Sequence, residues 1–299
     1  MLPSLSTLMA ILITVLIRIA PFCTIRKIEV TWGILTTLLS PSPMLRLWIL
    51  TIARMQDKVL ELIEVCKTYK GELFEKPFRA LDGITFELVR NKSFGLIGLN
   101  GAGKSTTIKI ILGLIFPDSG EVRVFGKSPF EEEVKRKLSY LPENPNFYEN
   151  LKGYELLEWV GRLRGLMGKW LKEETEKWLC KVGLEKDGGK LIKKYSRGMV
   201  QRLGLAQAFI GNPELIILDE PLNGLDPLGR KMARDLIAEA LDNGATIFFT
   251  SHILEDIEKI CDRVCIIHKG KILKFVETKE VENLEKEFIK TLEEYEKNA

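Results

Sequence analysis

The chain has 299 residues, of which 45% are hydrophobic and 28% are charged. This length suits one large domain or two of ordinary size, with enough residues to bury a substantial core. The composition is in the globular range, which excludes a wholly disordered chain, a disulfide-bonded mini-protein and a bundle of membrane helices.

The net charge of +3 is unevenly distributed along the chain. Residues 1–54 hold five basic residues and one acidic residue, which leaves 39 of the 44 basic and 40 of the 41 acidic residues for the rest. That remainder lacks the basic balance typical of nucleic-acid-binding domains, so we expect no nucleic-acid partner. The five cysteines include no Cys-x-x-Cys pair, and only two histidines could join them, which argues against a zinc site.

Residues 1–54 form an apolar N-terminal extension whose composition differs from the rest. Met1–Ile17 carries no charge, which reaches only the lower length limit of a membrane-spanning helix. Three interpretations are open: a membrane anchor, an additional interaction segment, or an extension upstream of a natural start at Met55. We favour the last, because the alternating strand pattern of Lys58–Lys70 begins almost directly after Met55.

Short apolar runs alternate with helical patterns after this extension. Ser93–Gly98, Leu215–Leu218 and Thr246–Thr250 have the length and continuity of strands that are buried on both faces of a parallel sheet. The alternation predicts an α/β core over residues 55–275.

Two other regions carry helical patterns. Between about residues 148 and 191, Leu, Trp, Lys and Glu recur at helical spacing without a strand-like run, which predicts a helical subdomain inserted in the core. Residues 276–299 are predicted to form a C-terminal amphipathic helix, with apolar positions at Val281, Leu284, Phe288, Leu292 and Tyr295. We expect this helix to pack on its own domain, with a dimer or partner helix as the alternative.

Residues 98–105 match the phosphate-binding pattern G-x-x-x-x-G-K-[ST] in full. The motif follows the strand pattern of Phe94–Ile97 and precedes the helical pattern of Thr106–Leu114, as the pattern requires. The glycines let backbone N–H groups turn toward a triphosphate, Lys104 supplies a positive charge, and Ser105 offers a hydroxyl to Mg²⁺. The predicted nucleotide-binding residues are Gly98, Leu99, Asn100, Gly101, Ala102, Gly103, Lys104, Ser105 and Thr106.

Two carboxylates follow the second apolar run. Asp219 and Glu220 stand at its end, directly before Pro221. Asp219 can hold the shell of a Mg²⁺ ion, and Glu220 can orient and deprotonate a water beyond the γ-phosphate. We therefore predict Asp219 as a metal-binding residue and Glu220 as a catalytic base.

The order of these motifs resembles that of the ATP-binding cassette (ABC) ATPases, and the resemblance covers nearly all of residues 55–275. Tyr195–Met199 stands about 20 residues before Asp219, where the family has its signature sequence. Asn223–Asp226 resembles the family's D-loop, and Thr250-Ser251-His252 ends a strand as the family's switch histidine does.

The resemblance implies an α/β P-loop fold of the ABC type, with a mixed sheet, flanking helices, an antiparallel β subdomain and the inserted helical subdomain. It also implies ATP and Mg²⁺ as cofactors, and hydrolysis by Glu220 with His252 touching the γ-phosphate. Two cassettes, expected to be a homodimer, would pack head to tail with each ATP between one cradle and the other subunit's Ser196 and Gly198. Tyr69 stands where the family stacks an aromatic ring on adenine.

The sequence departs from the commonest family pattern in two places. Arg197 and Met199 stand where a Gly and a Gln are usual, and Glu143 occupies the usual Gln position of the loop that enters the helical subdomain. Both changes occur in a branch of prokaryotic cassettes that serve two-component exporters and multidrug or lantibiotic-type pumps. Glu143 still offers Mg²⁺ an oxygen, so we include it among the metal-binding residues.

The function implied by the resemblance is that of the ATP-hydrolysing subunit of a transporter. It would act at the cytoplasmic face of the membrane on a separate transmembrane permease, since residues 55–299 show no spanning segment. The helical subdomain and the Glu143 loop would form the docking surface, and the branch favours export. The alternative is a soluble ABC ATPase that acts on nucleic acid or ribosomes. An inactive scaffold is disfavoured, because all the residues named for hydrolysis are present.

Overall fold

A computed structural model describes residues 58–70 and 77–298 of the chain. The predicted extension over residues 1–54, with the three interpretations of it, lies outside the described residues. Within the described ranges, no helix combines the length and the apolar character that crossing a membrane would require.

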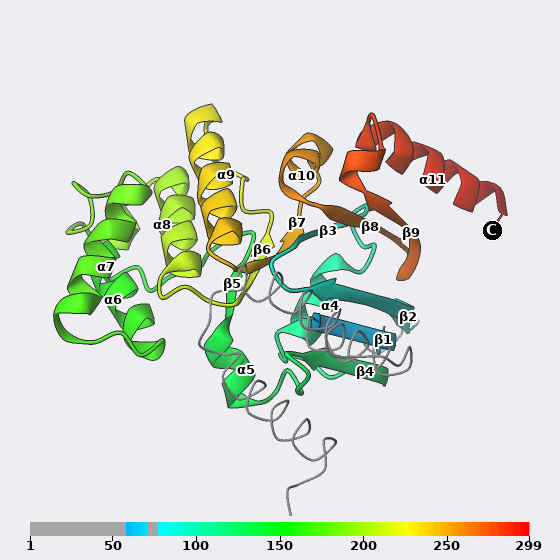
Figure 1. The fold of residues 1–299 in the computed structure, drawn as a ribbon, viewed down its shortest axis with the longest axis horizontal. Helices are drawn as coiled ribbons and strands as arrows, with labels where there is room; N and C mark the ends of the chain where they lie inside the picture. Colours follow the sequence, from blue (N-terminus) through cyan, green and yellow to red (C-terminus); the bar gives the residue numbers. More distant parts are fainter. Residues whose placement is uncertain (1–57, 71–76, 299) are drawn as a thin grey trace, which may run out of the picture. The chain divides into compact units, whose positions relative to one another are not determined.

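The larger sheet has six strands in the order β5-β6-β7-β3-β8-β9 (Figure 1). The first five of these strands run parallel, and β9 is added antiparallel at the edge. All residues of β3 and β7, and four of the five in β6, are buried, so these three predicted strands are confirmed. The strands are β3 (Ser93–Ile97), β5 (Leu138–Leu141), β6 (Leu215–Asp219), β7 (Thr246–Thr250), β8 (Arg263–His268) and β9 (Lys271–Glu277).

A second sheet has three antiparallel strands in the order β2-β1-β4. They are β1 (Lys58–Tyr69), β2 (Phe78–Val89) and β4 (Ser119–Val124). The predicted first strand is present, but the register of β1 shifts near Glu64, where φ is +50°. This shift interrupts the simple alternation that the sequence indicates.

The helices flank the larger sheet or form the inserted subdomain. Within residues 148–191 the structure has α6 and α7, which pack against each other and against α8 (Figure 1). With the mixed sheet and the antiparallel β subdomain, this arrangement confirms the predicted fold class. The helices are α4 (Lys104–Ile111), α5 (Glu132–Lys137), α6 (Gly153–Leu163), α7 (Gly168–Lys181), α8 (Arg197–Phe209), α9 (Pro227–Asp242), α10 (Leu254–Ile260) and α11 (Leu284–Asn298).

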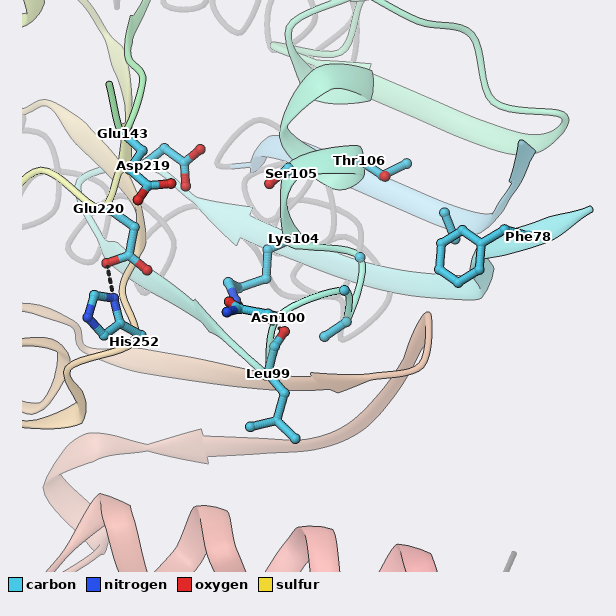
Figure 2. Close-up of a pocket in the computed structure, with 14 residues that line it drawn as sticks. Phe78, Leu99, Asn100, Lys104, Ser105, Thr106, Glu143, Asp219, Glu220 and His252 are labelled. Atoms are coloured by element: carbon cyan, nitrogen blue, oxygen red, sulfur yellow. Dashed lines mark hydrogen bonds and ion pairs between the residues drawn. The ribbon is translucent and has the colours of Figure 1, made fainter. Parts of the chain in front are cut away.

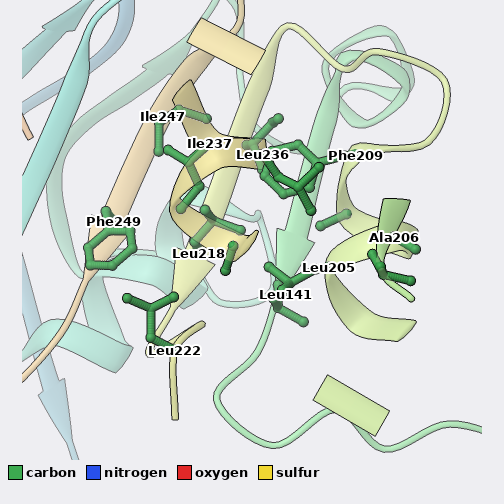
Figure 3. Packing of buried hydrophobic residues seen from close by; sticks show 14 of the residues in the cluster. Leu141, Leu205, Ala206, Phe209, Leu218, Leu222, Leu236, Ile237, Ile247 and Phe249 are labelled. Atoms are coloured by element: carbon green, nitrogen blue, oxygen red, sulfur yellow. The ribbon is translucent and has the colours of Figure 1, made fainter. Parts of the chain in front are cut away.

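The hydrophobic core consists of two clusters, and β6 and β7 contribute to both. Because side chains alternate across a strand, Leu218 and Phe249 belong to the cluster that also contains residues of α8 and α9, such as Phe209 (Figure 3). Ile217 and Phe248, one position away, belong to the cluster with α4 and the small sheet. The central strands are therefore apolar on both faces, which explains their continuous apolar sequences.

The C-terminal helix begins later than predicted. Residues 271–277 continue as β9, and a short 3₁₀ turn at Thr278–Glu280 precedes α11. Leu284 is fully buried, and Phe288 packs against the first hydrophobic cluster. The prediction that this helix packs on its own domain is confirmed.

Candidate functional site

A cleft of about 390 Å³ lies where β3 and β6 end, at the edge of the sheet where α/β proteins bind ligands. In Figure 2, the carboxylates of Glu143, Asp219 and Glu220 stand on one side, with Lys104 and Ser105 facing them. The lining residues are Phe78, Ala80, Leu99, Asn100, Gly101, Ala102, Gly103, Lys104, Ser105, Thr106, Glu143, Asp219, Glu220 and His252. Most of the predicted site residues thus come together.

The loop between β3 and α4 is packed too closely for side chains at two glycines. A Cβ on Gly98 would lie 2.3 Å from the carbonyl oxygen of Ile267, and one on Gly103 would lie 2.8 Å from that of Ala80. Gly103 is also the N-cap of α4, so no cap side chain accepts hydrogen bonds from the first-turn N–H groups. These N–H groups have no partner within the helix and favour an anion. The loop therefore fits a phosphate chain.

We expect Gly98→Ala to lower the free energy of unfolding by about 1–3 kcal/mol, because the added methyl would overlap the carbonyl of Ile267 in β8, a strand that is paired with β3 and β9. Urea denaturation followed by circular dichroism measures this change. Gly189→Ala is the matched control, since Gly189 is exposed and an added Cβ would meet nothing within 4 Å. Similar losses in both variants would contradict the packing argument.

The side chain of Lys104 folds back onto the loop that precedes α4. Its ammonium donates to the carbonyl oxygens of Gly98 at 2.6 Å and Leu99 at 3.3 Å. Burial lowers the pKa of Lys104, while the nearby carboxylates, Glu220 first, oppose this shift. A charged phosphate oxygen is a stronger acceptor than a neutral carbonyl, so a bound triphosphate fits this ammonium.

Asp219 is held by the neighbouring strand. The hydroxyl of Thr250, at the end of β7, donates to Asp219 Oδ1 at 2.5 Å. Burial raises the pKa of Asp219, and the carboxylates of Glu220 and Glu143 raise it further by repulsion. A bound cation beside Asp219 would favour its ionised form.

Glu220 and His252 form a hydrogen-bonded pair. Glu220 Oε2 lies 2.8 Å from His252 Nδ1 (Figure 2). The backbone of Glu220 has φ +49°, in the left-handed region, and its N–H donates to the carbonyl oxygen of Thr250 at 3.0 Å. This conformation is unfavourable for a non-glycine residue, so the surrounding structure must hold it. The result is a largely buried carboxylate that borders the cleft beside an imidazole.

The predicted metal-binding residues, Ser105, Glu143 and Asp219, all line the cleft. Among the described residues, no group of three or more His, Cys, Asp or Glu side chains could hold a metal by itself. Mg²⁺ commonly binds through one or two carboxylates together with substrate phosphates and waters, rather than in an all-protein cage. The residues therefore fit Mg²⁺ in the company of a triphosphate.

The aromatic side chain that lines the cleft is not the predicted one. Tyr69 is not among the lining residues, but it pairs in register with Phe78, which does line the cleft. The side chains of both are exposed, Phe78 by 56%. Stacking of Tyr69 on adenine stays a prediction, and Phe78 is a second candidate that no motif in the sequence indicates. Phe78 is identified by its place in the cleft lining, opposite Tyr69 in the paired strands β1 and β2.

The predicted signature residues lie outside the cleft, at the start of α8. Ser196 caps this helix by accepting a hydrogen bond from the N–H of Met199 at 3.3 Å. Gly198 and Arg197 both pack on the D-loop: a Cβ on Gly198 would lie 3.4 Å from the carbonyl oxygen of Gly224, and one on Gly224 would lie 3.2 Å from Arg197 Nε. The predicted signature thus contacts the predicted D-loop of its own chain and does not line its own cleft.

Comparison with known proteins decides the family. The family model of ABC transporters matches residues 81–223. The bacitracin transport ATP-binding protein BcrA of Enterococcus faecalis is 41% identical over 231 residues, which cover 76% of this chain and 72% of that protein. The chain belongs to the ABC transporter ATP-binding proteins.

Two further ABC proteins agree with this assignment. An uncharacterized ABC transporter ATP-binding protein of Synechocystis sp. is 40% identical over 223 residues, 73% of this chain. The chain spans 63% of that relative's length, which is less than two thirds. A solved structure described as the ATP binding subunit of an ABC transporter matches with a TM-score of 0.71 and 30% identity, covering 78% of this chain and 99% of that one. The predicted resemblance to ABC ATPases is confirmed.

Proposed function

We propose that this chain binds and hydrolyses ATP with Mg²⁺, and that it powers transport through a separate membrane permease. One observation carries the proposal. A single cleft holds the ammonium of Lys104, the hydroxyl of Ser105 and the carboxylates of Asp219 and Glu220, and Glu220 is hydrogen-bonded to His252. These are the groups that phosphoryl transfer to water needs.

In the proposed reaction, Lys104 and the first-turn N–H groups of α4 hold the β- and γ-phosphates. Ser105, Asp219 and Glu143 would hold Mg²⁺, which supplies positive charge to the phosphate oxygens when it is bound. Glu220 accepts the proton of the attacking water, and its hydrogen bond to His252 keeps the carboxylate directed at that position.

The signature supports a site completed by a second cassette. Ser196 and Gly198 lie at a helix N-terminus, where N–H groups favour anions, yet they do not line the cleft of their own chain. A second copy packed head to tail would bring them to the γ-phosphate held by the first. ATP would then bridge the two copies, and hydrolysis would release them.

A hollow on the helical subdomain supports the permease partner. Its volume is about 490 Å³, and its aromatic members Tyr148 and Trp159 are exposed by 72% and 50%. Large exposed aromatics around a hollow are typical of protein interfaces. The lining also holds two carboxylates, which favour a permease segment that carries a basic residue. The lining residues are Tyr148, Glu149, Asn150, Leu151, Glu155 and Trp159.

We propose export as the direction of transport and the cytoplasmic face of the membrane as the location. The direction is supported by Glu143, Arg197 and Met199, which match the exporter branch, and by the similarity to BcrA, a protein named for bacitracin transport.

Light scattering of the full chain carrying Glu220→Gln tests the proposal. We expect the solution mass to double on addition of ATP and Mg²⁺, because removal of the base traps the bridged state. The same chain with Lys104→Ala added is the control and should stay monomeric. A parent that binds ATP but stays monomeric would contradict the two-cassette site.

We expect Glu143→Gln to retain ATP binding. The amide oxygen still suits Mg²⁺, and loss of the charge removes repulsion of the triphosphate. Isothermal titration calorimetry should show an affinity within about tenfold of the unchanged chain. Glu149→Gln, in the hollow that we assign to the permease, is the control. A loss of affinity larger than tenfold would show that the charge itself is needed.

A further inference from the structure

Arg164 is a half-buried cation that joins three elements. It directly follows α6, and its guanidinium donates to the carbonyl oxygens of Ala208 at 3.3 Å and of Ile210, both at the end of α8. It also donates to the hydroxyl of Ser139 in β5 at 2.6 Å. Within the described part of the chain, no carboxylate forms an ion pair with Arg164.

The surroundings of Arg164 explain how a charge is tolerated there without an acid. Burial lowers the pKa of Arg164 to about 10, so the guanidinium stays charged at neutral pH. Its charge faces the end of α8, where the last carbonyl groups have no partner within the helix and the helix dipole is negative. The stem of Arg164 lies against Gly211, where a Cβ would meet its Cδ at 3.0 Å. Loss of the guanidinium would leave these carbonyl groups unpaired.

The three elements that Arg164 joins also lead to the permease hollow, the predicted signature and the nucleotide cleft. The helix α6 contributes Glu155 and Trp159 to the permease hollow. The helix α8 begins directly after Ser196 of the signature, and β5 leads to Glu143 in the nucleotide cleft. Arg164 is therefore placed where a shift of α6 can reach both the signature and the cleft.

Close to its N-terminus, α8 is hydrogen-bonded to the core. The buried side chain of Gln201 donates to the carbonyl oxygen of Pro221, directly after Glu220, at 2.9 Å. A stiff helix that is held near both ends moves as a unit, so the hydrogen bonds of Arg164 at one end help to set the orientation of the signature at the other.

We propose that Arg164 is a positioning residue that couples the permease hollow on α6 to the signature end of α8 and to the Glu143 loop. The inference rests on the proposed two-cassette ATP site. None of the described residues that form hydrogen bonds with Arg164 lines the nucleotide cleft, so we expect its removal to leave ATP binding by one chain intact. The loss appears when two cassettes close, because the signature no longer lies where the partner's ATP needs it.

The test uses the full chain with Glu220→Gln as the parent and adds Arg164→Met or Arg164→Lys. Arg162→Met is the matched control: Arg162 is in the last turn of α6, two residues before Arg164, its side chain is 63% exposed, and it pairs with Glu158. ATP affinity is measured by calorimetry, dimerisation in MgATP by light scattering, and stability by thermal unfolding.

We expect all variants to bind ATP within about twofold of the parent. Arg164→Met should raise the dimer dissociation constant by roughly tenfold, and Arg162→Met should leave it unchanged. Arg164→Lys should restore part of the loss, because an ammonium keeps the charge but lacks the fork that reaches separate acceptors. If Arg164→Met does not fold, ATP affinity and dimerisation of Arg164→Lys test the proposed role of Arg164 instead.

A dimer dissociation constant for both Arg164 variants equal to that of the parent would overturn the inference. So would parallel losses of ATP affinity, dimerisation and thermal stability, since that pattern describes a general loss of structure. A parent that binds ATP and stays monomeric would overturn the proposed two-cassette site, and this inference with it. The parent alone gives that result, so it is distinguished from a failure that appears only in the Arg164 variants.

Discussion

We expect replacement of Glu220, the proposed general base, with Gln to lower the rate of ATP hydrolysis by about 10²–10⁴-fold, the range typical for removal of such a base. The amide has nearly the same shape and can keep a hydrogen bond to His252, but it cannot accept the proton of the attacking water. ATP affinity should change little, because Lys104 and the first turn of α4 are untouched. Release of phosphate at saturating MgATP measures the rate.

The control for this experiment is Glu255→Gln. Glu255 is exposed on α10, three residues beyond His252, and it pairs with Lys259. It does not line the cleft, so its replacement should leave hydrolysis unchanged. If Glu220→Gln kept more than about a tenth of the rate, another group would have to be the base.

Lys104→Ala should weaken the binding of MgATP by about 10²-fold or more. Charge-assisted hydrogen bonds contribute about 1.5–3 kcal/mol each, and each 1.4 kcal/mol corresponds to about tenfold in affinity. Within the described residues, the side chain donates hydrogen bonds to two carbonyl groups of its own loop and to no other element, so we expect the folded structure to be retained. Titration calorimetry measures the affinity, and thermal unfolding measures the stability.

Lys109→Ala provides the comparison, because Lys109 is an exposed basic residue in the last turn of the same helix. We expect it to bind MgATP as the unchanged chain does. An affinity for Lys104→Ala within about threefold of the unchanged chain would show that the backbone N–H groups alone hold the phosphates.

The direction of transport is a separate part of the proposed function. It depends on the permease, and the hollow around Trp159 is the described surface that we assign to it. Hydrolysis by Glu220 and closure by the signature would hold for transport in either direction.

The sequence by itself determined the phosphate loop and the strand-end carboxylates. Gly98 to Ser105 is a contiguous motif, and Asp219 and Glu220 directly follow a buried strand, so neighbours along the chain define their geometry. The central strands could be predicted from the sequence for a related reason. A strand buried on both faces is apolar throughout, and that run is visible without knowledge of its partners.

Only the tertiary structure decided which distant residues meet. Phe78 reaches the cleft because β2 pairs with β1 in one register, and a shift of one residue would send it to the other face. The hydrogen bonds of Arg164 join β5, α6 and α8, whose residues 139, 164, 208 and 210 show no shared spacing. The exclusion of Ser196 from its own cleft likewise follows from where α8 packs. Contacts of this kind depend on strand register and helix packing, which the spacing of residues along the chain does not encode.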